Sequence, residues 1–344
     1  MSVSLFAVIL LSQCVVAKAE WMLSKNLSMW YPDWEICAIQ NNSAFDMKSW
    51  KHVTKYCNIT TNINLCFAGG QYQHHYCHNG RNLSSFVSSS YDNDVDSTNY
   101  VLKLIDEVGK RNGSIYFDGD SQMTNFRQGV YCDLYRQKLQ KLDWNRELHT
   151  IDSGSKKVGF TSTVHTDISV SHNASAAFRQ VENHIASRFD AGFSYVLLIV
   201  GLGTHYNEGR HASEGKAVYR KRLELMLPFW NSIPERFSNY TVHVAFTETP
   251  PQHWESKNGY WARAKSKCVP VRDPSPDLDW RNSILRDVVK TLDLRQISII
   301  STRYLIDLYS EHCLGDFNDC THYAYWPMLY QPIYRQIYDI VRVR

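Results

Sequence analysis

The chain has little of what marks non-globular proteins. Its 344 residues include only 16 Gly and 10 Pro, which excludes collagen-like and low-complexity chains. It has no block of like charge, and 37 Lys and Arg against 34 Asp and Glu leave a formal net charge of only +3. This balance gives no reason to expect a nucleic-acid partner. What the chain does have is 44% hydrophobic residues, enough for a large folded core.

Long hydrophobic runs are also missing, except at the start of the chain. An apolar run from Val3 to Val16 precedes the small-x-small site Ala17-Lys18-Ala19. The run is shorter than the roughly 20 residues of a membrane-spanning helix, so we interpret residues 1–19 as a signal peptide, with a weak anchor as the alternative. We therefore expect a protein of the secretory pathway, extracellular or in the Golgi or ER lumen, without stable membrane insertion after signal removal.

Cysteine is plentiful enough to suggest disulfides. Eight cysteines follow the expected signal peptide, and an even number in a secreted chain favours a disulfide framework over metal sites. Four of them lie between residues 37 and 77, so we expect residues 20–99 to form a disulfide-rich segment packed on a catalytic domain of residues 100–344.

The run HHYCH at residues 74–78 invites a zinc hypothesis, which the expected oxidation of Cys77 disfavours. Seven Asn-x-Ser/Thr sequons suggest a glycoprotein: Asn26, Asn41, Asn58, Asn82, Asn112, Asn173 and Asn239.

From residue 100 onward, short strand-like runs alternate with amphipathic segments. The runs rich in β-branched and aromatic residues are Ser114–Asp118, Lys157–Thr161, Tyr195–Val200, Val242–Phe246 and Ile297–Ile300. The segments with apolar residues at helical spacing are Tyr100–Arg111, Ala174–Phe189, Ala217–Ile233 and Trp280–Leu292. This alternation predicts an α/β fold with a parallel sheet covered on both faces. Functional residues are then expected just after the strands, at the carboxyl edge of the sheet.

The first expected strand runs directly into Gly119-Asp120-Ser121. A glycine permits a tight turn there, and the backbone amides of a helix starting near Gln122 would favour a developing oxyanion at Ser121. The alternative is that Ser121 is an ordinary helix N-cap after a strand. The tripeptide alone does not decide between these interpretations.

A serine nucleophile needs a base, and the best candidate lies near the C-terminus. Asp319 and His322 are three residues apart, so on a helical turn both would lie on one side. The carboxylate would then orient the imidazole toward Ser121, and Cys320 would fix the turn through a disulfide. The alternative is a surface turn with an incidental histidine.

Together these segments resemble the SGNH, or GDSL-like, esterase superfamily. Within it the closer similarity is to the PC-esterase group, which includes plant trichome-birefringence-like polysaccharide O-acetyltransferases and animal neurexophilin-and-PC-esterase and sialate O-acetyltransferase proteins. FDGDS at residues 117–121 resembles the first block of that group, and DCTHY at residues 319–323 resembles the last. The resemblance implies a three-layer α/β/α, flavodoxin-like sheet and covers about residues 112 to 340.

Two middle segments extend the resemblance with substitutions. TETPPQHW at residues 247–254 is similar to the Arg-Thr-x-Ser-Pro-x-His-Phe block, with Thr247 and Pro250 in place of Arg and Ser. VGLGTHY at residues 200–206 is similar to the Asn-Thr-Gly-His-Trp block but lacks its leading Asn. The last block carries Tyr323 where plant members typically have Trp.

The resemblance implies an acyl-serine mechanism with Ser121 as nucleophile, His322 as general base and Asp319 as orienter. The oxyanion would be held by the Ser121 amide and by loop donors whose identity the missing Asn leaves open. The candidates for oxyanion or substrate binding are Gly119, Ser162, Thr163, Gly201, Gly203, His205, Asn207, His253 and Trp254. For His253 the alternative is a structural histidine, and for the aromatic residues near these blocks it is core packing.

We therefore expect a secreted or lumenal O-acetyltransferase or acetylesterase acting on a glycan or polysaccharide. No metal or resident cofactor is expected, and the acetyl donor stays open between acetyl-CoA and an acetylated intermediate. The oligomeric state is also open. One alternative is a non-catalytic glycan- or receptor-binding protein on the same fold, against which the three triad residues argue. Another is a lipase-like esterase with an apolar pocket.

Overall fold

The computed structural model describes most of the chain from residue 99 onward. The described residues are 99–123, 125–127, 130, 149–153, 156–164, 174–206, 215–255, 269, 280–307, 312–314, 318–323 and 330–343. The expected signal peptide, the expected disulfide-rich segment up to residue 98 and the histidine cluster at 74–78 lie outside this part. They stay predictions.

Five parallel strands and one antiparallel edge strand form the main sheet, in the order β2-β3-β1-β4-β5-β6. The parallel strands are β1 (Gly113–Gly119), β3 (Lys156–Val164), β4 (Tyr195–Gly201), β5 (Thr241–Thr247) and β6 (Ile297–Ile300). The edge strand β2 (His149–Ser153) pairs antiparallel with β3. All five runs expected as strands are parallel strands of this sheet, which confirms the α/β prediction.

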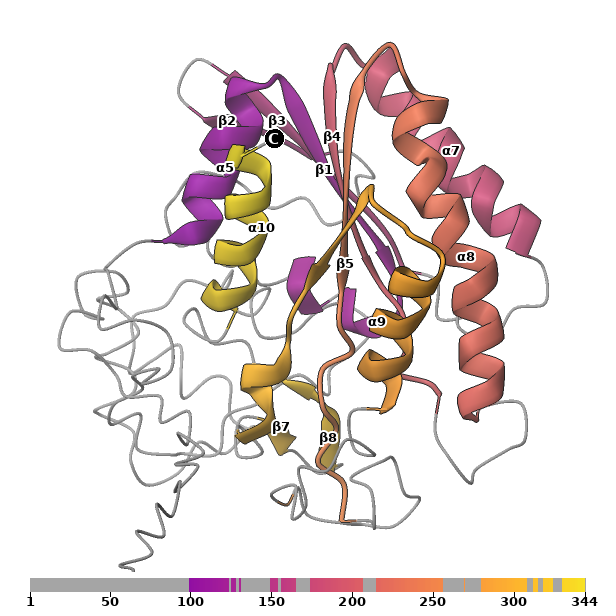
Figure 1. Ribbon diagram of the computed structural model, residues 1–344. Coiled ribbons are helices and arrows are strands. Elements are labelled where there is room, and N and C mark those ends of the chain that lie inside the picture. Colours follow the sequence, from indigo (N-terminus) through magenta and orange to yellow (C-terminus); the bar gives the residue numbers. More distant parts are fainter. Residues whose placement is uncertain are drawn as a thin grey trace, which may run out of the picture.

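Helices cover both faces of the sheet (Figure 1). One face carries α5 (Tyr100–Lys110) and α10 (Gln331–Val343), and the other carries α7 (Ala174–Asp190), α8 (Lys216–Arg236) and α9 (Trp280–Thr291). The four segments expected as helices are α5, α7, α8 and α9. The strand side chains alternate between the two cores: Ile115 and Phe117 lie in one, and Tyr116 lies in the other.

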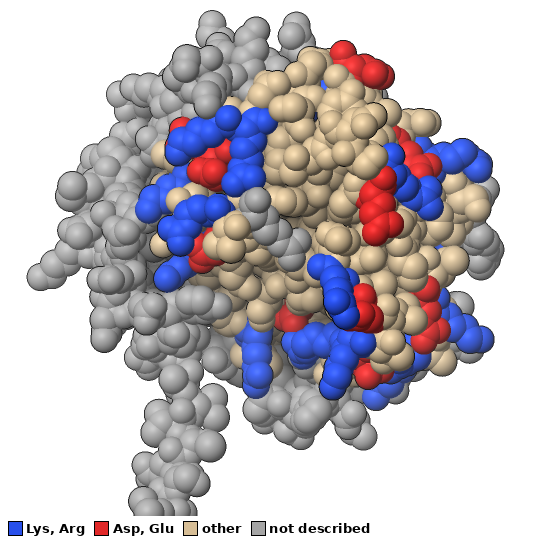
Figure 2. All heavy atoms as spheres, turned by 45° about the horizontal axis from the view of Figure 1, so that its top comes forward, with Lys and Arg blue, Asp and Glu red and all other residues tan. Residues whose placement is uncertain are grey.

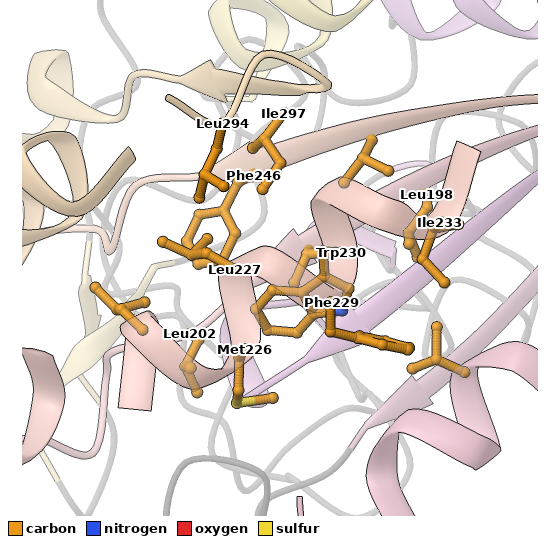
Figure 3. Close-up of a cluster of buried hydrophobic side chains, with 14 of the residues drawn as sticks. Leu198, Leu202, Met226, Leu227, Phe229, Trp230, Ile233, Phe246, Leu294 and Ile297 are labelled. Carbon is orange, nitrogen blue, oxygen red and sulfur yellow. The ribbon is translucent and has the colours of Figure 1, made fainter. Parts of the chain in front are cut away.

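The core on the α8 side shows how the layers pack. Leu227, Trp230 and Ile233 of α8 contact the same buried cluster as Leu198 of β4 and Phe246 of β5 (Figure 3). All five side chains are at most 1% exposed. Fully burying one such aliphatic side chain contributes about 1.5–3 kcal/mol, so this interface holds the helix layer firmly on the sheet.

The strand order creates a particular position between β1 and β4. Among the parallel strands the order by sequence is 2-1-3-4-5, so the chain leaves β1 on one side of the sheet and later returns on the other. The ends of the two strands meet as a pair, Gly119 opposite Gly201. Open α/β sheets bind their ligands at such a switch point, and the segment after β1 begins with Ser121.

A second, two-stranded sheet lies beyond the carboxyl ends of the main strands (Figure 1). It pairs β7 (His312–Leu314) antiparallel with β8 (Asn318–Tyr323). This small sheet and the helix α10 are absent from the elements expected from the sequence. The small sheet places the C-terminal block that contains His322 at the edge where the site is expected.

Charged side chains of both signs are mixed on the face shown in Figure 2. Around α5, for example, Lys110 pairs with Asp106 at 2.7 Å and Arg111 lies 3.4 Å from Glu107. Within the part of the chain that the structure describes, no helix is long and apolar enough to cross a membrane.

Gly119 allows the ends of β1 and β4 to lie close together. Its φ is +143°, and a Cβ there would lie 2.0 Å from the carbonyl oxygen of Gly201. Gly192 has a positive φ of +91° but open space around its Cβ position. A substitution at Gly192 therefore measures the cost of a positive φ without any cost of steric overlap.

We expect Gly119→Ala to lower the free energy of unfolding by about 3 kcal/mol or more, because strain and overlap add. Gly192→Ala, which meets strain alone, should lower it by about 1 kcal/mol. Urea unfolding of both variants measures the difference. Equal losses would show that the φ angle alone, and not the approach of two strands, requires glycine at 119.

Candidate active site

The sequence-predicted nucleophile and base meet in the structure. Ser121 and His322 are 201 residues apart in the chain, yet Ser121 Oγ lies 2.6 Å from His322 Nε2. Ser121 is the first residue of the helical segment after β1, and His322 lies in β8. The serine is only 4% exposed, while the imidazole is partly exposed. A serine hydroxyl at this distance from an imidazole nitrogen can pass it a proton.

Asp120, not Ser121, is the N-cap of this helical segment. Asp120 Oδ1 accepts a hydrogen bond from the Gln122 amide at 3.0 Å, which is the usual contact of an N-cap side chain. Its other oxygen, Oδ2, accepts from the amides of Gly203 at 3.1 Å and Thr204 at 3.0 Å. One buried carboxylate therefore joins the start of the helical segment that carries Ser121 to the loop after β4, and the hydroxyl of Ser121 is left for His322.

The amide of Ser121 is the first candidate for an oxyanion donor. Asp120, Gln122 and Met123 all use their amides in hydrogen bonds, whereas the described residues offer no acceptor to the Ser121 amide. The first amides of a helix have no partner within the helix and carry its positive partial charge. This donor can stabilise negative charge that develops beside Ser121 Oγ.

Strand β8 positions the C-terminal block, and the expectation of a helical turn there is wrong. Asp319 pairs with Cys313, and Tyr323 pairs with His312. The register shifts between these two pairs, because three residues of β8, 320–322, lie between partners that are adjacent in β7. Strand pairing with β7 overrides the local helical spacing, and the irregular register breaks the simple alternation of sides. The side chain of Asp319 lies outside the described part, so its role as orienter stays a prediction. The disulfide expected at Cys320 is present.

The three glycines near the site keep backbones close together. The carbonyl oxygen of Gly201 accepts a hydrogen bond from the Asp120 amide at 3.1 Å. Gly203 has a φ of +150°, and a Cβ there would lie 2.0 Å from Thr249 Oγ1. Because the Gly203 amide is already bound by Asp120, it is unavailable as an oxyanion donor in this structure.

The remaining oxyanion candidates are placed only in part. His205 follows Thr204, whose amide binds Asp120, so it lies at the same edge as Ser121. Its Nε2 is buried and has no hydrogen-bond partner among the described residues. Ser162 and Thr163 lie near the carboxyl end of β3, but their side chains, like all of Asn207, lie outside the described part.

His253 is a buried histidine with structural contacts. It is 0% exposed, its Nε2 donates to the carbonyl of Ile306 at 2.7 Å, and its amide donates to the carbonyl of Cys320 at 3.0 Å. Its Nδ1 lies 3.4 Å from the hydroxyl of Tyr323. Burial lowers the pKa of His253 from 6.5 to about 4, and this effect outweighs the hydrogen bond to Ile306, which raises the pKa. These contacts favour the structural alternative over a contact with substrate.

Trp254 and Tyr323 are also buried, at 6% and 2% exposed. The indole Nε1 of Trp254 donates to Thr321 Oγ1 at 2.9 Å, and the hydroxyl of Tyr323 donates to the carbonyl of Pro251 at 2.9 Å. Both aromatic side chains therefore belong to the packing around β8. Three other aromatic residues near these blocks, Trp261, Tyr325 and Trp326, lie outside the described part.

Sequence reasoning missed several side chains that hold the site. Asp120 stands in the Gly-Asp-Ser motif, so its position was visible, but its bonds to the loop after β4 were not. Gln122, Gln252 and Arg281 gave no sequence signal at all, because their partners are backbone and side-chain groups of distant segments.

No family model matches the chain, and no curated protein matches it. The described residues also contain no group of three or more His, Cys, Asp or Glu side chains arranged to hold a metal ion.

The Asp120 carboxylate should be required for stability as well as for the site. Asp120→Asn keeps the shape but replaces one acceptor oxygen by a donor, which leaves at least one of its three amide partners unpaired. We expect a loss of about 1–3 kcal/mol in the free energy of unfolding. As a control, Asp287→Asn removes a carboxylate paired with Arg220 on the surface and should cost less than about 1 kcal/mol. A similar loss in both variants would contradict this role.

The burial of His253 should appear as pH-dependent stability. Its lowered pKa means that the unfolded chain binds the proton first, so stability is complete above pH 6.5 and falls as the pH drops toward 4. The contribution lost over this range is up to about 3 kcal/mol. In urea unfolding, the stability difference between wild type and His253→Gln should therefore shrink from pH 7 to pH 4. A difference that stays constant would refute the assignment.

Proposed function

We propose that the protein is a serine-dependent O-acetyltransferase or acetylesterase that acts on glycan O-acetyl groups through an acyl-serine intermediate. The observation that carries this proposal is the 2.6 Å contact between Ser121 Oγ and His322 Nε2 at the switch point of the sheet. The helix-start amide of Ser121, to which the described residues offer no acceptor, supports it. A non-catalytic binding protein on the same fold has no need for this combination.

In the proposed reaction, His322 Nε2 accepts the hydroxyl proton as Ser121 Oγ attacks the acetyl carbonyl carbon. The negative charge that forms on the carbonyl oxygen faces the Ser121 amide. The C–O bond to the leaving alcohol then breaks, and His322 returns the proton to that alcohol. Acetyl-Ser121 remains until a sugar hydroxyl, or water, attacks it with the same base. In this scheme Asp319 orients the imidazole.

The fold supports the more specific assignment to an SGNH-like, flavodoxin-like architecture. The order 2-1-3-4-5 is that of flavodoxin-like sheets, and in the proposed assignment the serine block follows the first strand while the histidine block comes from the C-terminal part. The disulfide at Cys320 supports passage through an oxidising compartment such as the secretory pathway. The choice of a glycan as substrate comes from the resemblance to the PC-esterase group, since Trp254 and Tyr323 are packed inside the fold.

The first experiment is acylation by a small aryl acetate, followed by phenolate release and intact mass. We expect wild type to show a burst and one added acetyl group. Ser121→Ala should show neither and should lose about a thousandfold or more in rate. Ser187→Ala, at an exposed serine of α7, serves as the matched control.

Adding candidate glycans to the acetylated enzyme separates transfer from hydrolysis, because transfer moves the acetyl group onto the sugar. If wild type and Ser121→Ala behave alike from pH 5 to pH 9, as measured by both readouts, the acyl-serine proposal fails. The binding-protein alternative would then be the better account.

A further inference from the structure

The residue next to the proposed base carries an unusual number of hydrogen bonds. The hydroxyl of Thr321 accepts from Trp254 Nε1 at 2.9 Å and from Gln252 Nε2 at 3.1 Å. Its carbonyl oxygen accepts from Gln122 Nε2 at 2.9 Å. Thr321 is only 7% exposed, so water competes little for these bonds. Three side chains from two other segments therefore converge on the residue before His322.

Gln252 connects Thr321 to the rest of the carboxyl edge. The same Nε2 that reaches Thr321 lies 3.2 Å from the carbonyl of Thr204, in the loop that holds Asp120. Its Oε1 accepts from Arg281 Nη2 at 3.1 Å, and Arg281 Nε donates to the carbonyl of Tyr206 at 2.8 Å. The hydroxyl of Thr321 is thus linked through Gln252 to Arg281, at the start of α9.

The main chain around Thr321 is fixed from both sides. Before it, the carbonyl of Cys320 accepts from the His253 amide at 3.0 Å. After it, the side chain of Tyr323 packs among Leu305, Pro251 and His253. The Gln122 contact ties this stretch directly to the helical segment that carries Ser121. Between these anchors, His322 has a defined position relative to the serine.

We propose that Thr321 is a positioning residue for His322, and that its hydroxyl, by accepting from Trp254 and Gln252, sets the imidazole at hydrogen-bonding distance from Ser121. The catalytic consequence rests on the proposed function, whereas the placement of the imidazole does not. Thr321→Val keeps nearly the same shape but removes the acceptor of the Trp254 indole N–H and of one of the two N–H groups on Gln252 Nε2. The segment must shift to satisfy these N–H groups. A displacement of about 1 Å at a reacting group can reduce a rate by about 100-fold.

The test compares three variants. Thr321→Val removes the acceptor, and Thr321→Ser keeps it. Thr302→Val is the matched control, because Thr302 is fully buried and its hydroxyl has no hydrogen-bond partner among the described residues. For each protein, the acylation rate constant and KM for the aryl acetate are measured together with the NMR titration of the His322 imidazole, assigned by comparison with His322→Gln.

We expect Thr321→Val to lower the acylation rate constant about 100-fold with little change in KM, and to shift the His322 resonance and its titration. Thr321→Ser should stay within about threefold of wild type, and Thr302→Val should match wild type. The inference is overturned if Thr321→Val acylates at the wild-type rate with an unchanged His322 signal. It is also overturned if Thr321→Val and Thr302→Val give the same results.

Two further outcomes are kept separate. If wild type is not acylated at all, the proposed function fails, but the NMR comparison still decides the placement: a His322 signal shifted in Thr321→Val and restored in Thr321→Ser supports it. If Thr321→Val does not fold, Trp254→Phe replaces it in the test. This variant removes the indole N–H itself, so no buried donor is left without an acceptor. That variant should show a smaller loss, about tenfold, and a wild-type rate with an unshifted His322 signal would overturn the inference.

Discussion

The site depends first on the carboxylate of Asp120. A buried charge loses several kcal/mol of hydration, and this loss must be offset by direct partners. Here three backbone amides, from Gln122, Gly203 and Thr204, point at its two oxygens, and the start of a helix adds its positive partial charge. Because those amides come from the segments after β1 and β4, the charge fixes the two loops of the switch point to each other. Ser121, the next residue, inherits that fixed position.

The second half of the site is held differently. Strand β8 belongs to a separate two-stranded sheet, so no main-sheet ladder aligns His322 with Ser121. Side chains hold β8 in place instead. Gln122, in the helical segment that carries Ser121, and Gln252, in the loop after β5, both donate hydrogen bonds to Thr321. A buried polar network of this kind is stabilising only when its members are satisfied, and it then selects one arrangement of the loops. This explains why residues 248–254 are mostly buried although they are neither helix nor strand.

The predictable part of the structure is the part whose pattern is local. Buried parallel strands are continuous apolar runs, so β4, with YVLLIVG buried along its whole length, is readable directly. The same holds for α5, whose apolar residues recur at helical spacing after the N-cap Asn99. The small sheet could not be read this way, because β7 and β8 are short, mostly polar and joined by an irregular register. Their pairing is decided by distant contacts, and so is the place of His322.

Two histidines of the C-terminal half, His253 and His322, show where sequence reasoning reaches its limit. His253 and His322 each stand in a motif, and each lies after a segment that leads to the carboxyl edge. Desolvation separates them: His253 is completely buried, with a pKa lowered to about 4, and stays neutral as a donor to Ile306. His322 is partly exposed and faces a serine hydroxyl instead. A base must exchange protons near neutral pH, so burial, which the sequence does not encode locally, favours a structural role for His253. The partly exposed imidazole of His322 is compatible with the role of base that we propose for it.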